Sequence, residues 1–411
     1  MAVRAGNRPV WFALIGLLAS SCGLVGTDAL PGDADPLSVG AALSLTGSLS
    51  QDGQLVKEGY LFCQEWLNNH GGVALNGHPY RLDIRMMDDE SRVSLSAGDL
   101  EQLISQNHVK LLLGPSANST TARDAAIAEQ HQLPMVQSDG PSAAIFNNHY
   151  RYVFGVGAPA RRQMEGVIDM ALNQDVKPQS VAILAANDTL STELGGEMRD
   201  YATSRGLSVV YFGAYPSGTN DVRSQLAGAA AANPDLLLEA GHSDESVLTM
   251  QQAGQLNVPA RLIAFTQEPT GADFVKPLGK IANYAVGTTQ WSPLAKVPTT
   301  DFLTGQDYAN QYLSRFGHAP DQHSAGATAA CLTLAAAAHQ AGSADPAKVR
   351  DALTRVDLHT FFGEIRFDDQ GANPSKAVYV EQVQSGKPVV VWPPEAAGAL
   401  PRYPIPAWDK R

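Results

Sequence analysis

The sequence predicts an α/β fold in which doubly wound parallel sheets build two lobes. Short apolar stretches alternate along the chain with small polar loops and amphipathic segments, which is the pattern of strand–loop–helix units. In the first unit, residues 38–45 form an apolar strand, Thr46–Gly53 a Gly/Ser-rich loop, and residues 55–69 a helix that ends at Gly71-Gly72. A chain of 411 residues is too long for one small core and fits two domains.

Later segments repeat this unit in order. The helix expected over residues 94–107, for example, has Leu100, Leu103 and Ile104 at helical spacing on one face. Further strands are expected at residues 81–87, 109–113, 133–137, 180–185, 207–211, 234–241, 262–265 and 284–288. Further helices are expected at residues 122–131, 160–173, 193–205, 221–232, 246–253, 301–316, 324–341 and 348–356. A hairpin is expected over residues 361–371, with turn residues at its tip, followed by late strands at 377–384 and 388–391.

Composition and motifs exclude several classes of function. The formal net charge of −12 argues against general binding of nucleic acid or anionic membrane. The chain has no Gly-x-Ser-x-Gly elbow, no phosphate-binding loop and no His-Glu-x-x-His helix, so no enzyme and no cofactor is predicted. The acidic run Asp88-Asp89-Glu90 is interpreted as a solvated loop rather than as a metal site.

The first residues are typical of a targeting segment. Arg4 and Arg8 precede a short apolar core at residues 11–18, and small residues then lead to Cys22. This pattern predicts export, and it resembles a bacterial lipoprotein box in which Cys22 becomes the lipidated N-terminus; an ordinary cleaved signal is the alternative. We therefore expect a lipoprotein signal peptide over residues 1–22, a flexible tether over 23–36 and an extracytoplasmic, membrane-anchored protein.

Cys63 and Cys331 are the cysteines that follow this leader. Export to an oxidising compartment permits a disulfide between them. Both lie in predicted helices among apolar neighbours, and this setting favours buried free thiols, with the disulfide as the alternative. No Cys/His group has zinc-site spacing, so no metal is predicted.

Three polar loops follow strands of the first half and open helices. They are Thr46–Gly53, Ser116–Thr121 and Ser138–Ser142. Helix capping alone would explain each loop singly. All strand-to-helix loops of a parallel sheet lie at the same edge, however, so the set favours a ligand pocket at that edge.

Several motifs resemble the Leu/Ile/Val-type periplasmic binding protein family. They are Leu45-Thr46-Gly47, the hairpin Gly71-Gly72 to Asn76-Gly77, the paired acids Asp88-Asp89 and the closing hairpin Gly363 to Asp368. The resemblance covers residues 36–391 and implies a type I periplasmic binding protein-like fold with two lobes joined by three crossovers. It places residues 37–155 and 289–360 in the N-terminal lobe, 156–288 and 361–392 in the C-terminal lobe, and 393–411 in a surface coil.

The resemblance also implies a set of ligand-binding residues, with two departures from the family pattern. Asp139 could pair with a cation of the ligand but would repel a carboxylate, and Leu190 stands where the family has an aromatic ring. Both departures favour a polar amino acid, an amide or urea over a branched-chain amino acid. The expected ligand-binding residues are Asp52, Asn118, Ser119, Asp139, Gly140, Pro141, Ser142, Leu190, His242, Gln267 and Glu268.

Together these features predict a solute-binding protein. It would capture a small polar solute between the lobes by hinge closure and deliver it to the permease of an ABC transporter. The alternative is a sensor that reports the ligand to a membrane receptor or kinase.

Overall fold

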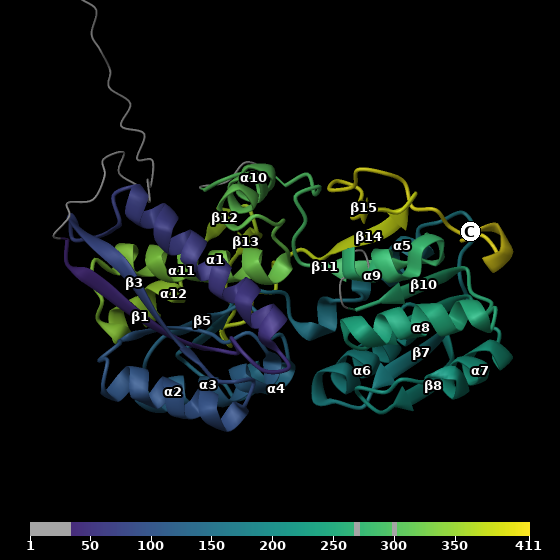
Figure 1. Cartoon of the computed structure of the whole chain (residues 1–411), viewed down its shortest axis with the longest axis horizontal. Coiled ribbons are helices and arrows are strands. Elements are labelled where there is room, and N and C mark those ends of the chain that lie inside the picture. Colours follow the sequence, from purple (N-terminus) through teal and green to yellow (C-terminus); the bar gives the residue numbers. More distant parts are fainter. Residues whose placement is uncertain (1–33, 267–271, 298–301) are drawn as a thin grey trace, which may run out of the picture.

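The computed structural model describes residues 34–266, 272–297 and 302–411, which form two α/β lobes side by side (Figure 1). Cys22, with the predicted signal peptide, and the predicted ligand residues Gln267 and Glu268 lie outside the described residues. Within the described part, no helix combines the length and the apolar character needed to cross a membrane.

The first lobe contains a six-stranded sheet in the order β2-β3-β1-β4-β5-β6. All neighbouring pairs are parallel except β2 and β3. The central strand β1 is buried on both faces because its residues are apolar or small, with Ala41, Ala42 and Leu43 at most 1% exposed. The strands are β1 (Pro36–Leu43), β2 (Val73–Leu75), β3 (His78–Asp88), β4 (Leu111–Leu113), β5 (Met135–Gln137) and β6 (Val153–Gly155).

Helices cover both faces of this sheet (Figure 1). Apolar residues of α2 (Val93–Ser105) and α3 (Asn118–His131) pack on one face, and those of α1 (Ser50–Asn69) and α11 (Gln322–Ala341) pack on the other. Helix α11 is buried without interruption from Ser324 to Ala338, which its alanine-rich sequence permits. The remaining helices of this lobe are α4 (Ala143–Phe146), α10 (Gly305–Phe316) and α12 (Pro346–Leu353).

A disulfide joins the two central helices of the first lobe. The sulfurs of Cys63 on α1 and Cys331 on α11 are 2.00 Å apart, so the expectation of free buried thiols was wrong. One turn before Cys63, Gly59 lets the helices approach closely, since a Cβ there would lie 2.3 Å from the Ser324 carbonyl oxygen. This close contact brings the two cysteine Cα atoms to 6.3 Å, a separation that a disulfide can span.

The second lobe contains a seven-stranded sheet in the order β15-β14-β11-β10-β9-β7-β8. The five strands from β7 to β11 are parallel. Strand β14 pairs antiparallel with β11, and β15 pairs antiparallel with β14. Alternate residues of β7 face two separate cores: Val181 and Ile183 face α5 and α6, whereas Ala182 and Leu184 face α7, α8 and α9. The strands are β7 (Ser180–Ala186), β8 (Ser208–Tyr215), β9 (Leu236–Ala240), β10 (Leu262–Phe265), β11 (Val286–Thr289), β14 (Tyr379–Gln384) and β15 (Lys387–Trp392). The helices are α5 (Glu165–Leu172), α6 (Thr189–Ser204), α7 (Arg223–Ala231), α8 (Ser243–Gln255) and α9 (Ala272–Leu278), with 3₁₀ turns η1 (Ala160–Arg162) and η2 (Gly279–Ala282).

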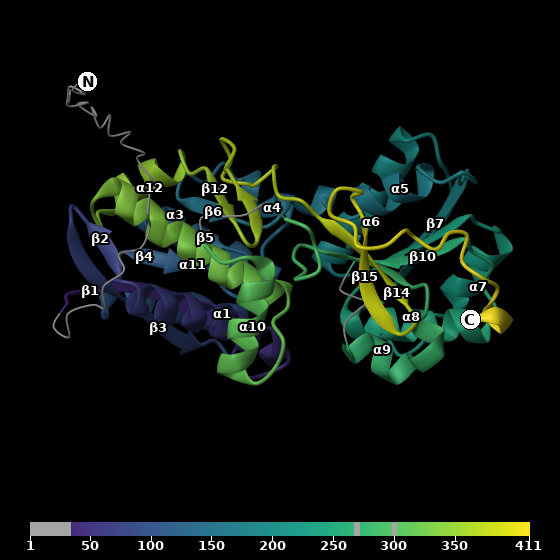
Figure 2. The ribbon, with the colours of Figure 1, turned by 90° about the horizontal axis from the view of Figure 1, so that it is seen from above.

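The chain passes between the lobes after β6, after β11 and before β14 (Figure 2). Before the last passage, β12 (Leu358–Thr360) and β13 (Gly363–Ile365) form a hairpin. The hairpin therefore spans residues 358–365 rather than the expected 361–371, and the two phenylalanines of its turn, Phe361 and Phe362, are buried in the core of the first lobe. Phe367 and Ala372 are also buried in cores of the first lobe, so the chain is still in this lobe at residue 372, beyond the expected boundary at residue 361.

Residues 393–411 have little regular structure, with one 3₁₀ turn, η3, at Trp408–Lys410. They cross the second lobe and are packed on it rather than lying free (Figure 2). Ile405 is 7% exposed and its N–H donates to the Arg261 carbonyl at 2.9 Å, and the Trp408 indole N–H donates to the Val258 carbonyl at 2.9 Å. The tail therefore belongs to the fold of the second lobe.

Candidate functional site

The three polar loops of the first lobe follow β1, β4 and β5, which are parallel neighbours. Their carboxyl ends therefore lie at one edge of the sheet, as predicted. Two contacts show that this edge meets the second lobe. The Gln51 amide lies 3.3 Å from Asp273 Oδ2 on α9, and the Ala143 N–H donates to Glu193 Oε1 on α6 at 2.8 Å.

In the loop Thr46–Gly53, Thr46 forms hydrogen bonds within its own lobe. Its hydroxyl donates to Asp88 Oδ2 at 2.8 Å, and its carbonyl accepts from the Ser91 hydroxyl at 2.7 Å. The neighbouring Asp89 is fully buried, so the interpretation of residues 88–90 as a solvated loop was wrong for this carboxyl. Gly53 lies so close to β1 that a Cβ would be 1.9 Å from the Ser44 carbonyl oxygen, and this contact fixes the first turn of α1, which carries Asp52.

The second loop leaves the N-terminus of α3 open. Ala117 is at the N-cap position and cannot cap the helix with its side chain, while the hydroxyls of Thr120 and Thr121 donate back to its carbonyl. The Ser116 hydroxyl is buried and has no hydrogen-bond partner among the described residues. Ser119 is exposed in the first turn. Free backbone N–H groups, the helix dipole and a buried hydroxyl together suit an anion such as a carboxylate.

The third loop is held from both lobes. The Gly140 N–H donates to Gln137 Oε1 at 2.6 Å, and the Pro141 carbonyl accepts from Ala160 N–H of the first crossover at 2.9 Å. The Ser142 hydroxyl donates to Glu193, and the Ser142 N–H donates to Asn118 Oδ1 at 3.2 Å. Ser142 is therefore hydrogen-bonded both to Asn118 of its own lobe and to Glu193 of the second lobe.

Asp139 in this loop is already paired. Its Oδ1 lies 2.6 Å from Nδ1 of His323 on α11, and its Oδ2 accepts from the Ser138 hydroxyl at 2.6 Å. Burial opposes the charge on His323, but attraction to Asp139, Asp321 and Asp52 outweighs it and raises the pKa of the imidazole well above its usual value. Asp139 is therefore the partner of an imidazolium, a role that the sequence did not suggest because the two residues are 184 positions apart.

The second lobe presents a similar pair. Asp188 caps α6 by accepting from the Ser191 N–H at 3.0 Å, and its other oxygen lies 3.2 Å from His242 Nε2. The hydrogen bond with Asp188 raises the pKa of His242 against the effect of burial. Leu190, in the first turn of α6, is half-buried and packs on the core of its own lobe.

Asp52 is in the first turn of α1. Its carboxylate interacts electrostatically with His323, Asp139 and Asp321 of its own lobe and with His242 of the second lobe. The residue is half-buried, and its carboxylate accepts no side-chain hydrogen bond from the described residues. Burial raises the pKa of Asp52, the charge of His323 opposes this rise, and the carboxylates of Asp139 and Asp321 add to it.

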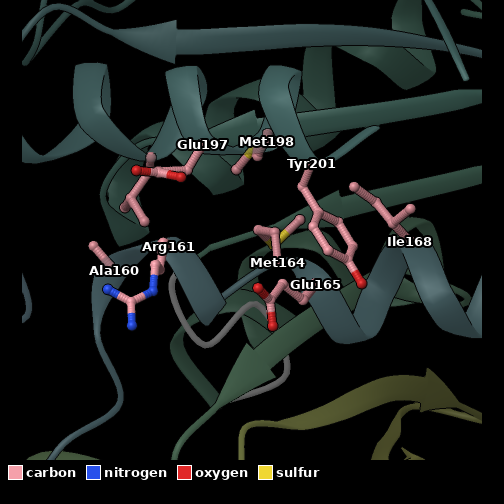
Figure 3. Close-up of a pocket in the computed structure, with 9 residues that line it drawn as sticks. Ala160, Arg161, Met164, Glu165, Ile168, Glu197, Met198 and Tyr201 are labelled. Atoms are coloured by element: carbon pink, nitrogen blue, oxygen red, sulfur yellow. The ribbon is translucent and has the colours of Figure 1, made fainter. Parts of the chain in front are cut away.

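Two other features bear on the location of the site. A hollow on the second lobe is formed by η1, α5 and α6 (Figure 3), but it is too narrow to admit a water molecule and none of the predicted ligand residues lines it. In the described part of the chain, no group of three or more His, Cys, Asp or Glu side chains is arranged to hold a metal ion. The edge that carries the three loops is therefore the candidate site.

Comparisons with known proteins agree with this architecture. A family model described as periplasmic binding protein matches residues 36–388. The Leu/Ile/Val-binding protein homolog 7 of Brucella melitensis is 24% identical over 406 residues, covering 94% of this chain and 99% of that protein. Homolog 8 of Brucella abortus is 23% identical over 387 residues, covering 89% of this chain and 92% of that protein.

Solved structures share the fold at low sequence identity. The branched-chain amino acid transporter substrate binding protein LivJ of Streptococcus pneumoniae, in complex with isoleucine, has a TM-score of 0.75 at 18% identity and covers 86% of this chain and 98% of its own. The leucine binding protein LivK of Thermotoga maritima has a TM-score of 0.75 at 22% identity, with 86% and 97% covered. The predicted fold class, with two lobes of type I, is confirmed. The chain belongs to the periplasmic binding protein family, as its resemblance to Leu/Ile/Val-type members indicated.

Proposed function

We propose that this chain is an extracytoplasmic solute-binding protein that captures a small amino-acid-like solute between its lobes and delivers it to an ABC transporter. The family match and the substrate-binding function stated for the solved neighbours support the general role. The observation that carries the proposal is the open N-terminus of α3 beside the buried Ser116 hydroxyl, at the edge that meets the second lobe.

The carboxylate of the solute would lie at this helix terminus. The backbone N–H groups of the first turn and the hydroxyls of Ser116 and Ser119 would hold it, and the partial positive charge of the helix end would stabilise it. His242 and Leu190 of the second lobe would cover the solute, and a side-chain oxygen of Gln267 or Glu268 would accept a hydrogen bond from its ammonium. Closure of the lobes would complete these hydrogen bonds and exclude water, so the closed state would be favoured by the solute's additional contacts.

Thermal melting of protein stripped of carried-over solute, against a panel of amino acids, amides and small carboxylates, tests the proposal. A ligand at about 100 times its Kd adds roughly 2.7 kcal/mol of stability, which gives a clear rise in Tm. Ser116→Ala should weaken binding on the order of tenfold or more because a hydrogen bond to a charged group is lost. Ser105→Ala at the exposed end of α2 is the matched control. Ser116→Ala binding as tightly as wild type would place the carboxylate elsewhere.

Delivery and anchoring are parts of the proposal with their own tests. Uptake of the bound solute by vesicles that contain the cognate permease and ATPase should require the protein. Mass spectrometry of the N-terminal peptide from membrane-extracted protein should find the lipid on Cys22, and Cys22→Ala should release the protein from the membrane. An unmodified Cys22 in membrane-extracted protein would refute the anchor.

A further inference from the structure

The carboxylate of Glu193 joins the two lobes directly, away from the three crossovers. Glu193 is on α6 of the second lobe, and its two oxygens accept from two donors of the first lobe. Oε2 accepts from the Ser142 hydroxyl, and Oε1 accepts from the Ala143 N–H at the start of α4, at 2.8 Å. Because the acceptor is charged, both hydrogen bonds are stronger than bonds between neutral groups.

Each end of this contact is anchored in the core of its own lobe. Ile145 and Phe146 of α4 are buried in a core of the first lobe, and Leu194, next to Glu193, is buried in a core of the second. A Cβ on Gly195 would lie 2.9 Å from the Cβ of Ala185 on β7, so α6 packs tightly on its own sheet. Neither helix can follow the other lobe, and movement of α4 away from α6 therefore breaks the bonds to Glu193.

The contact also occupies a side chain that the sequence assigned to the solute. Ser142 is fully buried, and besides donating to Glu193 its hydroxyl accepts from the Ala144 N–H at 3.2 Å. The other direct contact between the lobes, from Gln51 to Asp273, is a single bond of 3.3 Å between exposed side chains. Water competes for an exposed bond, so we expect the two bonds to Glu193 to contribute more to holding the lobes together.

We infer that Glu193 is a latch, whose carboxylate holds the lobes together in the absence of solute, and that Ser142 belongs to this latch rather than to the residues that bind the solute. Glu193 would then set the ratio of closed to open protein before any solute arrives. The apparent affinity of a solute for the closed form scales with the fraction of protein in that form. The latch would therefore tighten binding without touching the solute.

The chemistry of the contact predicts the effect of a substitution. In Glu193→Gln the amide has one oxygen, so only one of the two donors keeps an acceptor and the amide NH₂ faces the other donor. In Glu193→Ala both donors lose their acceptor. Loss of a hydrogen bond to a charged group should lower the ratio of closed to open protein on the order of 10- to 100-fold.

Distances between spin labels in the two lobes, measured by double electron–electron resonance on protein stripped of solute, test the latch. Gln102→Cys on α2 and Ser224→Cys on α7 place one label on an exposed position of each lobe (Figure 1), in a background with Cys22 replaced by serine. The background protein should show one main distance. Glu193→Gln and Glu193→Ala should each add a second, distinct distance, with the first reduced accordingly.

Variants that change one bond or a neighbouring charge complete the experiment. Ser142→Ala keeps the bond from the Ala143 N–H, so its distances should be intermediate between those of wild type and Glu193→Ala. Asp200→Asn removes an exposed carboxylate farther along α6 and should leave the distances unchanged. If Glu193→Ala does not fold, Glu193→Gln and Ser142→Ala decide the outcome.

Two results would overturn the latch. One is a Glu193→Gln variant with the same distances as wild type, and the other is a solute-free wild type that already shows the second distance as its main one. The measurement contains no solute, so either result would leave the proposed function standing. A melting panel without any ligand would in turn refute the proposed function and leave the latch in place.

Discussion

The disulfide between Cys63 and Cys331 should be a major source of stability. The bond joins residues 268 positions apart, so it restricts a very long loop in the unfolded chain. The chain-entropy relation gives about 5–6 kcal/mol for a loop of this length, and removal of native disulfides typically costs about 2–5 kcal/mol. We therefore expect reduction to lower the free energy of unfolding by about 2–5 kcal/mol.

Denaturant unfolding of oxidised and reduced protein, with Cys22 replaced by serine, measures this difference. The reduced protein keeps both sulfur atoms, so the comparison isolates the covalent bond from side-chain packing. The double variant Cys63→Ala/Cys331→Ala should unfold at the same denaturant concentration with and without reductant. Two titratable thiols in the unfolded, unreduced protein would refute the pairing, and equal midpoints before and after reduction would refute the magnitude.

The bond also bears on the candidate site. Asp52 is in the first turn of α1 and His323 in the first turn of α11, and the disulfide joins these same two helices. This covalent bond between the helices limits how far their first turns can move apart. Reduced protein should therefore bind solute more weakly than oxidised protein at a temperature where both are folded.

Three further predictions concern packing and buried charge. Gly53→Ala should lower Tm strongly, because the added Cβ would lie 1.9 Å from the Ser44 carbonyl oxygen. Gly98→Ala on α2, where an added Cβ would meet nothing within 4 Å, should be neutral or stabilising by up to about 1 kcal/mol. Equal changes in Tm for the two variants would refute the close contact at Gly53. Burial raises the pKa of Asp124 to about 7, so the stability that its protonated form contributes is present below pH 4 and lost as pH rises to 7. In denaturant titrations, the free energy of unfolding should differ between about pH 5 and pH 8 by roughly 2–3 kcal/mol less in Asp124→Asn than in wild type. An unchanged difference would contradict the raised pKa of Asp124. Burial lowers the pKa of Lys376 to about 7, so stability should rise between about pH 7 and 10, and a Lys376→Met variant that shows the same rise would contradict the assignment.

The sequence predicted those parts of the structure that local patterns determine. Alternating apolar strands and amphipathic helices fix a parallel sheet, and a parallel sheet places all strand-to-helix loops at one edge. The loops after β1, β4 and β5 therefore come together as predicted, although residues 46 and 142 are far apart in the chain. No detail of side-chain packing was needed for that step.

Local sequence patterns could not predict which distant elements pair with each other. Asp139 and His323 are 184 positions apart, and nothing near either residue indicates the other. Asp139 therefore looked like an acid available to a ligand cation, whereas the structure gives it an imidazolium partner. The same limit explains the missed disulfide, because helical spacing shows which face of a helix is buried but not which helix lies against it.

Gln290 of the second crossover links all three crossovers to the candidate site. Its carbonyl accepts from the Lys376 ammonium of the third crossover, and its Oε1 accepts from the Ala158 N–H of the first crossover at 2.6 Å. Its own N–H donates to Gln322 Oε1 at 3.0 Å, one position before His323. Rotation of the lobes about the crossovers must therefore strain or re-form bonds that reach the first turn of α11. Because His323 lies in that turn and is paired with Asp139, the hydrogen bonds of the crossovers and the charge pair at the candidate site are physically connected.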